Sequence, residues 1–292
     1  MLSLSKKKQN SCYTKVYNGP ETMNSKLKHQ IEREFHNHWA TQINPNEIDY
    51  EASFQSATAT ENHFVLSLLG NLNQKRILDL GCGLGDAALY FASKGALVSA
   101  VDISSGMIKL IKKLAKKNQF QLKIKAEVML AEKLKFPQNH FDFVYGNGLL
   151  HHVDLKKSLH QVHRVLKPAG KAIFIEPLAN NFIINLYRKM ASKVRTPTET
   201  PLPYHVLNDL SNLGFSHFSH REFHLFTLVI FLWFFLMERV HPNEQRYWKK
   251  LITEGDRVGG VFNILNRLDK LVLKKVPLLK KYCWNSVLVF EK

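Results

Sequence analysis

Short apolar runs alternate with helical patterns through the middle of this chain. Runs rich in Val, Ile, Leu and Phe indicate buried strands, and apolar residues returning every three or four positions indicate helices. The predicted strands are Arg76–Leu80, Leu97–Asp102, Leu122–Leu130, Phe141–Asn147, Lys171–Glu176, a strand from Phe215 into the 220s, and Asn285–Glu291. Strands that alternate with helices predict a parallel, doubly wound α/β sheet with right-handed crossovers.

Predicted helices fill the connections between these strands and also precede them. Leu27, Ile31, Phe35 and Trp39 recur every four residues and predict a helix over Asn24–Gln42. The other predicted helices are Ser56–Leu69, Asp86–Ser93, Gly106–Lys117, Leu155–Leu166 (ended by Lys167-Pro168-Ala169-Gly170), Asn181–Ser192 and Tyr204–Leu213.

The pattern divides the chain into four parts. We expect a flexible basic tail at 1–20, lid helices at 21–75, a ligand-binding core at 76–178, and the rest of the sheet at 179–292. The last part contains a connection, about 223–281, that is longer than ordinary loops and predicts a helical substrate cap.

Two segments of this cap leave alternatives open. Phe223–Met237 is almost wholly apolar, which is compatible with a buried or lid helix, an interfacial element or, least well for its length, a membrane span. Leu265–Lys275 is basic and amphipathic, so it fits either a helix packed on the sheet or one lying on an anionic membrane.

Charge and cysteine content limit the partners and the cellular compartment expected for this protein. The 292 residues carry a formal net charge of +17, which favours an anionic partner: nucleic acid, an acidic membrane surface or an acidic substrate. The three cysteines have neither disulfide nor metal-ligand spacing, and the N-terminus lacks the apolar stretch of a secretory signal. We therefore expect a cytoplasmic protein, with peripheral contact to a membrane as an open alternative.

The first predicted strand runs into a glycine-rich turn. Gly81, Cys82, Gly83 and Gly85 stand between this strand and the next predicted helix, as in a nucleotide-binding crossover. The third glycine comes one residue earlier than in the dinucleotide fingerprint, and Asp79 would repel a pyrophosphate. The carboxylate of Asp79 instead suits a ligand with an ammonium group.

A second acidic residue ends the next predicted strand. Asp102 is placed to accept hydrogen bonds from two ribose hydroxyls. Ile103 and Met107, which follow it, offer an apolar surface for an adenine ring. Together with the glycine turn, these residues predict a ligand that contains adenosine.

At this point the sequence resembles the class I S-adenosylmethionine-dependent methyltransferases, from about Arg76 to Pro177. The resemblance rests on several motifs in order: Leu78-Asp79-Leu80-Gly81-Cys82-Gly83-Leu84-Gly85, Val101-Asp102-Ile103-Ser104, Ala131 to Pro137, Phe141-Asp142-Phe143-Val144, Leu150-His151-His152-Val153, and Arg164 to Pro168. It implies a Rossmann-like, seven-stranded sheet with an antiparallel last strand, and S-adenosyl-L-methionine as cofactor.

The resemblance also implies a cofactor site. Gly81, Cys82 and Gly83 would line the methionine moiety, Asp102 would hold the ribose, Ala131 and Glu132 would border adenine, and the Asn147 backbone would lie near the amino group. Family members often have Asp where Leu130 stands, and losing that adenine contact costs on the order of 1 kcal/mol.

Two histidines follow the fourth strand, near where a transferred methyl group should point. His151 or His152 is a candidate general base if the acceptor must lose a proton, and the alternative is that both only shape the loop. His36, His38, His205, His217 and His220 are weaker candidates, and no group has metal-ligand spacing, so we predict no metal.

The acceptor class follows from what surrounds the core. Asn147-Gly148-Leu149-Leu150 is not the tetrapeptide of exocyclic-amine nucleic-acid methyltransferases, and no RNA-binding module is present. The apolar and basic cap favours a small or lipid-like acceptor. An RNA or tRNA methyltransferase and a non-catalytic S-adenosylmethionine-binding protein remain the alternatives.

Overall fold

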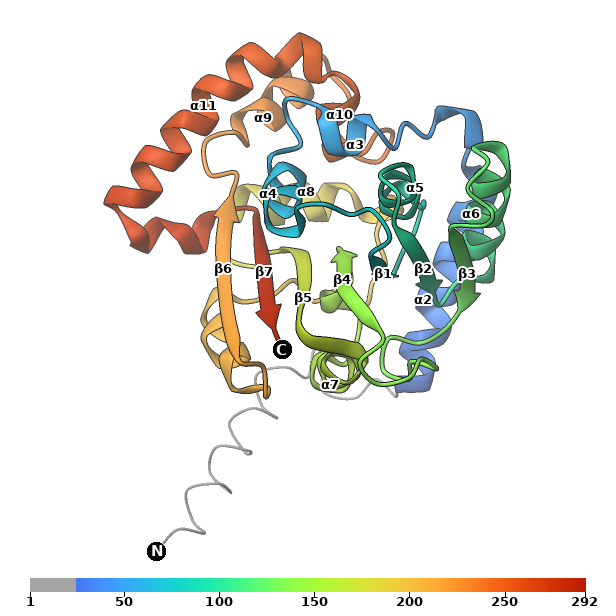
Figure 1. The fold of residues 1–292 in the computed structure, drawn as a ribbon. Coiled ribbons are helices and arrows are strands. Elements are labelled where there is room, and N and C mark those ends of the chain that lie inside the picture. Colours follow the sequence, from blue (N-terminus) through green and yellow to red (C-terminus); the bar gives the residue numbers. More distant parts are fainter. Residues whose placement is uncertain (1–24) are drawn as a thin grey trace, which may run out of the picture.

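The computed structural model describes residues 25–292, so the predicted tail at 1–20 lies outside the described residues (Figure 1). Seven strands form one sheet in the order β3-β2-β1-β4-β5-β7-β6. Only β7 runs against its neighbours, β5 and β6, which confirms the predicted fold class. The strands are β1 (Arg76–Leu80), β2 (Leu97–Asp102), β3 (Ile124–Val128), β4 (Phe141–Asn147), β5 (Leu166–Pro177), β6 (His217–Phe223) and β7 (Asn285–Glu291).

Helices cover both faces of the sheet and one of its ends (Figure 1). The α-helices are α2 (Ser25–Gln42), α3 (Ala52–Gln55), α4 (Thr60–Leu69), α5 (Asp86–Ser93), α6 (Ser105–Lys117), α7 (Leu155–Val165), α8 (Phe182–Met190), α9 (Val229–Leu236), α10 (Tyr247–Thr253) and α11 (Gly255–Lys275). Short 3-10 helices span Pro45–Glu47, Leu150–His152, Ser192–Val194, Tyr204–Asn212 and Pro277–Tyr282.

Neighbouring residues of β1 belong to two different apolar cores. Ile77 packs with α5 and α6 on one face, whereas Leu78 and Leu80 pack with α7 on the other. Successive side chains of a strand point to opposite faces, so a strand covered on both sides reads as a continuous apolar run. This double burial holds the end of β1 rigidly where the glycine turn begins.

The helix predicted over Ser56–Leu69 begins only at Thr60, as α4, because Ser56–Ala59 form a turn that separates it from the short preceding helix α3. In that turn the Ser56 and Thr58 hydroxyls donate to the carbonyls of Ile252 and Leu251, at 3.1 and 2.9 Å. The apolar spacing alone gave no sign of this break, because the contacts that stabilise the turn come from α10, far along the chain.

Three further elements differ from the prediction in their bounds or type. β5 begins at Leu166, directly after α7, because Leu166 pairs with Phe141 of β4 and Ala169 takes a left-handed φ of 61° that bends the strand. The segment from Tyr204 forms a 3-10 helix rather than an α-helix. The strand predicted at Leu122–Leu130 is confirmed in its central part as β3.

The apolar run Phe223–Met237 is divided among three elements. It supplies the end of β6, a polar turn and α9, whose buried residues pack with α10 and α11 in a separate apolar cluster. In the turn, His224 Nε2 lies 2.8 Å from a Glu61 carboxylate oxygen, and Asp269 of α11 accepts the backbone N–H groups of Leu225 and Phe226. Among the described residues, none of the helices has the length and apolar character needed to cross a membrane.

Candidate functional site

The glycine turn lies where β1 gives way to α5. Gly81 and Gly83 have φ values of 71° and 46°, a left-handed backbone that favours glycine. A Cβ on Gly81 would lie 2.7 Å from a methyl carbon of Leu149, whereas one on Gly83 would have only a backbone oxygen near 4.0 Å. The turn therefore requires glycine at Gly81 and leaves open space beside Gly83, where a ligand can approach the backbone.

Asp102 connects the ends of β1 and β2. Its Oδ2 accepts the Gly83 N–H at 3.0 Å, and its Oδ1 accepts the Ser104 N–H at 2.8 Å. Each carboxylate oxygen can accept a second hydrogen bond, so the group keeps capacity for ribose hydroxyls. These bonds orient the carboxylate before any ligand arrives.

Asp79 is a buried acid with an unsatisfied oxygen. It is 2% exposed, and its Oδ2 has no hydrogen-bond partner. Burial raises the pKa of Asp79 to about 8, and the nearby carboxyls of Asp102 and Asp86 push it the same way. A ligand ammonium beside this oxygen would satisfy it and restore its charge, so the residues present fit the amino-acid end of S-adenosylmethionine.

A cavity of about 380 Å³ opens at this end of the sheet. Nine of the predicted cofactor residues line it: Asp79, Gly81, Cys82, Gly83, Asp102, Ile103, Ala131, Glu132 and Asn147. The structure places two others elsewhere. Gly85 faces Ile111 of α6, with a φ of 83°, and the fully buried Met107 belongs to the apolar core under α6. Both support the turn from behind and do not line the cavity.

The buried pair of His151 and Glu176 stands at the cavity wall. Glu176 Oε2 lies 2.7 Å from His151 Nδ1, and Oε1 accepts the N–H groups of Leu149 and Leu150 at 2.9 and 2.7 Å. Burial raises the pKa of Glu176 to about 7 and lowers the pKa of His151. When Glu176 is ionised, it accepts the Nδ1 proton, which leaves Nε2 of a neutral imidazole free to take a proton.

His152 is tied to α2 and to the loop after α8. Glu32 Oε1 lies 3.0 Å from His152 Nδ1 and accepts the Thr196 hydroxyl at 2.9 Å and that of Thr198. Burial alone would raise the pKa of Glu32, but hydrogen bonds with His152 and His36 hold it well below its ordinary value. His29, also on α2, lies 3.2 Å from Glu132. One wall of the cavity is therefore α2.

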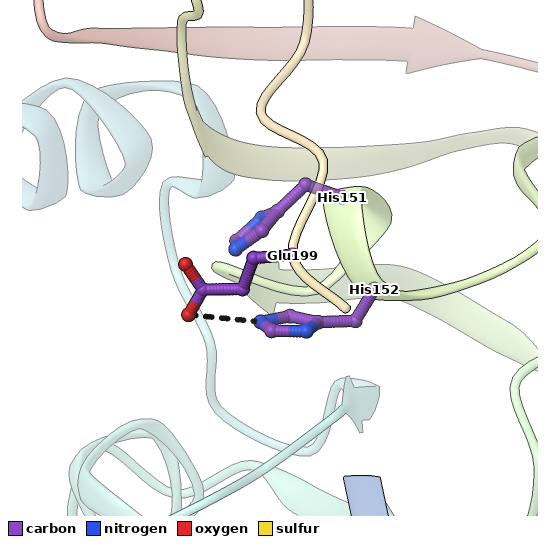
Figure 2. A group of neighbouring side chains, drawn as sticks. All are labelled: His151, His152 and Glu199. Atoms are coloured by element: carbon purple, nitrogen blue, oxygen red, sulfur yellow. Dashed lines mark ion pairs between the residues drawn. The ribbon is translucent and has the colours of Figure 1, made fainter. Parts of the chain in front are cut away.

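Figure 2 shows His151, His152 and Glu199 pointing toward one another. Their ligand atoms all lie within 4.8 Å of one another, and His152 Nε2 is 3.9 Å from Glu199 Oε1. Two histidines and a carboxylate can hold a transition metal, but Glu199 already forms an ion pair with Arg195. A cation would have to displace that arginine, and the absence of a metal stays a prediction.

Sequence reasoning missed both glutamates. The sequence analysis gave neither Glu176 nor Glu199 a role. The signal was a buried acid at the end of β5 and an acid in a Pro/Thr-rich loop. Only the fold brings either residue to the histidines.

The comparisons with known proteins agree with this geometry. Residues 78–174 match the family model of a methyltransferase domain. Over these residues the match agrees with the resemblance to the class I S-adenosylmethionine-dependent methyltransferases. A ubiquinone/menaquinone biosynthesis C-methyltransferase, UbiE, of Rickettsia bellii is 40% identical over 114 residues, which are 36% of this chain and 45% of that protein. The chain thus spans about half the length of the curated relatives it matches.

Solved structures share the methyltransferase fold over a larger part of the chain. The cyclase SpnF has a TM-score of 0.56 at 19% identity, covering 91% of this chain and 96% of its own. A putative sarcosine dimethylglycine methyltransferase from Galdieria sulphuraria has a TM-score of 0.52 at 17% identity, covering 80% and 85%. At these identities the likeness concerns the fold alone, and one of the two proteins is a cyclase, so the reaction must be argued from the site.

Proposed function

We propose that this protein transfers a methyl group from S-adenosyl-L-methionine to a small-molecule acceptor. The observation that carries the proposal is a single cavity lined by the glycine turn, Asp79, Asp102 and His151, with Glu176 behind His151. S-adenosylmethionine, when bound, supplies a methyl group already activated by its sulfonium. The protein's part is then to orient two reactants and to exclude water.

Three residues would hold the cofactor. Asp79 would pair with its ammonium, Asp102 would accept the ribose hydroxyls, and the open backbone at Gly83 would let the methionine moiety lie close. UbiE has C-methyltransferase in its name, and one solved structure of this fold, a Haemonchus contortus phosphoethanolamine N-methyltransferase, contains S-adenosylhomocysteine. Both support the same cofactor here.

His151 is the candidate general base. Glu176 positions its Nδ1 proton, and Nε2 then accepts a proton from the attacking oxygen, nitrogen or carbon of the acceptor. Glu176 is a positioning residue because it lies behind His151 with no exposure of its own. His152 is held by Glu32 and forms the adjoining wall.

Calorimetry with S-adenosylhomocysteine is the first test, because it needs no acceptor. We expect saturable one-to-one binding, and no binding at near-millimolar ligand would reject the proposal. Methyl-labelled S-adenosylmethionine should then be incubated with a metabolite extract and with bulk tRNA. Label in small molecules supports the proposal, and label in tRNA alone would favour the RNA alternative.

We also propose that the C-terminal helices contact an anionic membrane. Along α11, the residues Val261, Ile264, Leu268 and Leu271 form an apolar row on one side of the helix, here called the α11 stripe, and are 42–68% exposed. Exposed basic residues follow on the same helix: Arg267, Lys270, Lys274 and Lys275. Apolar residues beside cations suit a helix lying at the surface of anionic lipid.

The neighbouring helix α9 also exposes apolar residues, which is consistent with the same membrane-contacting surface. Val229, Trp233, Leu236 and Met237, at helical spacing, are 51–66% exposed, although the opposite side of α9 is buried. In Figure 1, α9 and α11 lie together beyond the end of the sheet toward which the β6 arrow points. A membrane there would leave the rest of the sheet in water.

A further inference from the structure

Two arginines reach the cavity without an acidic partner. Arg188 of α8 and Arg246, just before α10, both line it. Within the described residues neither has a carboxylate oxygen within 4 Å, whereas Arg195 beside them pairs with Glu199. A guanidinium withdrawn from water without a directly contacting counter-charge is costly, so an anion that entered the cavity beside these two side chains would stabilise them.

The hydrogen bonds of Arg188 also leave its positive charge without an acidic partner. It donates to the Asn185 side chain and to the Leu178 carbonyl at 2.6 and 3.0 Å, which fixes the plane of the guanidinium. Its Nε is buried and has no partner. Neutral oxygens thus orient the group and leave the charge and one donor for something else.

Arg246 is fixed in a similar way. One nitrogen donates to the Val194 carbonyl at 2.6 Å, and the guanidinium lies 4.0 Å from the ring centre of Trp39 on α2. Stacking on an aromatic ring and donation to a carbonyl hold an arginine without neutralising it. Burial lowers the pKa of both Arg188 and Arg246 to about 10; Arg195 adds to the shift and Glu199 opposes it in each case, and both remain charged at neutral pH.

These residues lie on a different part of the cavity wall from the cofactor residues. The cofactor residues come from the ends of β1, β2 and β4 and the loop after β3, whereas Arg188 and Arg246 come from α8 and the cap. His151 borders both groups, and Arg188 and Arg195 both lower its pKa, after burial and His152. The arginines therefore stand at the acceptor side.

We propose that Arg188 and Arg246 form a subsite for an anionic group, a carboxylate or phosphate, on the methyl acceptor. Planar guanidinium groups suit these oxyanions because they present paired N–H donors. The inference rests on the proposed methyl transfer for the identity of the cavity, and it names the class of acceptor. A divalent cation is a poor occupant of the same region, since it would face three arginines.

The test measures anion binding separately from cofactor binding. Protein saturated with S-adenosylhomocysteine is titrated with benzoate and phenyl phosphate, and with the neutral benzamide and benzyl alcohol. We expect at least one anion to bind at least tenfold more tightly than its neutral counterpart. Failure of S-adenosylhomocysteine itself to bind would reject the proposed function, which is a different result from failure of the anions.

Variants assign the binding to these two side chains. Arg188→Gln and Arg246→Gln should each weaken anion binding at least tenfold, and the Lys variants should recover part of it. The matched control is Arg76→Gln, an exposed arginine at the start of β1 that does not line the cavity. Unchanged affinity for S-adenosylhomocysteine in every variant shows that the fold is intact.

A vesicle-binding assay with the same variants distinguishes a free anion from a lipid headgroup. If the soluble anions fail to bind and retention on phosphatidylglycerol vesicles falls in the Gln variants, the anionic group belongs to a lipid. Equal binding of anionic and neutral probes, together with vesicle retention unchanged in both variants, would overturn the proposal.

Discussion

Three buried carboxyl groups near the cavity accept different sets of hydrogen bonds, and this difference suits each of them to a different role. Asp102 accepts two backbone N–H groups and keeps acceptor capacity for a ligand. Glu176 accepts two backbone N–H groups and contacts a histidine, so it positions another side chain. Asp79 has an oxygen with no donor, which leaves room for a cation.

For Asp102 we predict a loss of cofactor affinity. Asp102→Ala removes the acceptor for ribose hydroxyls and the bond that aligns Gly83, so the binding free energy for S-adenosylhomocysteine should weaken by about 1.5–3 kcal/mol. Isothermal titration measures the change. A dissociation constant equal to that of the wild type would show that Asp102 does not contact the ribose.

For Glu176 we predict a loss of turnover without a loss of binding. In Glu176→Gln, an amide N–H facing His151 Nδ1 would place the imidazole proton on Nε2 and remove the base, which should slow methyl transfer about 100-fold or more. Incorporation of labelled methyl into metabolites measures the rate. Glu222→Gln, a buried glutamate paired with His220 outside the cavity lining, is the control and should keep full rate.

For Asp79 we predict a pH-dependent change in stability. Its pKa rises from about 3.8 unfolded to about 8 folded, so the folded protein holds this proton more tightly and loses stability as pH rises from about 3.8 to about 8. Asp79→Asn stays neutral, so its Tm should be close to that of the wild type at pH 3.5 and exceed it by several degrees at pH 8.5. Equal Tm values at both pH values would contradict this explanation.

At the scale of elements, α2 is attached to the rest of the cavity wall through a few polar side chains. Glu32 bonds His152 of the 3-10 helix after β4, together with Thr196 and Thr198 of the loop after α8. Asn37, one turn along α2, accepts the Gly106 N–H at 2.9 Å and so attaches the helix to α6. Three segments distant in sequence therefore meet at α2.

We predict that Glu32→Gln loosens this arrangement. Loss of the charged acceptor should lower the free energy of unfolding by about 1.5–3 kcal/mol in urea titrations and speed proteolytic cleavage within α2. Glu34→Gln, on the exposed side of the same helix, is the matched control and should change neither value. A cleavage rate equal to wild type in Glu32→Gln would show that Glu32 does not anchor α2.

At the scale of the whole molecule, charge and apolar surface act together. A net charge of +17 favours anionic partners in general, and a local apolar surface would favour lipid over nucleic acid. The α11 stripe and the exposed side of α9 supply that surface. Cytoplasmic location with peripheral membrane contact therefore stays a prediction with a defined structural basis.

We predict that Ile264→Glu and Leu268→Glu in the α11 stripe abolish sedimentation with phosphatidylglycerol vesicles. Wild-type binding should weaken as salt rises, because the basic residues beside the stripe contribute electrostatically. Leu122→Glu, at an 89% exposed leucine before β3, is the control and should bind as the wild type does. Full binding by both α11 variants would place the lipid contact elsewhere or reject it.

The sequence by itself determined the sheet and its glycine turn. Strands β1, β2, β4 and β7 have the predicted bounds, because apolar runs between helices are local signals that a doubly wound fold reinforces. Most predicted cofactor residues meet in one cavity for a similar reason. They come from the carboxyl ends of neighbouring parallel strands, and the strand order implied by the family brings those ends together.

Only the tertiary structure determined which residues surround the acceptor side of the cavity. Glu32, Glu176, Glu199, Arg188 and Arg246 come from five separate segments, and nothing in their spacing indicates that they lie near His151 and His152. The break between α3 and α4 has the same origin, since its partners are on α10. Local patterns encode which residues are buried, whereas the meeting of distant polar groups depends on how the packed elements cross, which the local pattern does not specify.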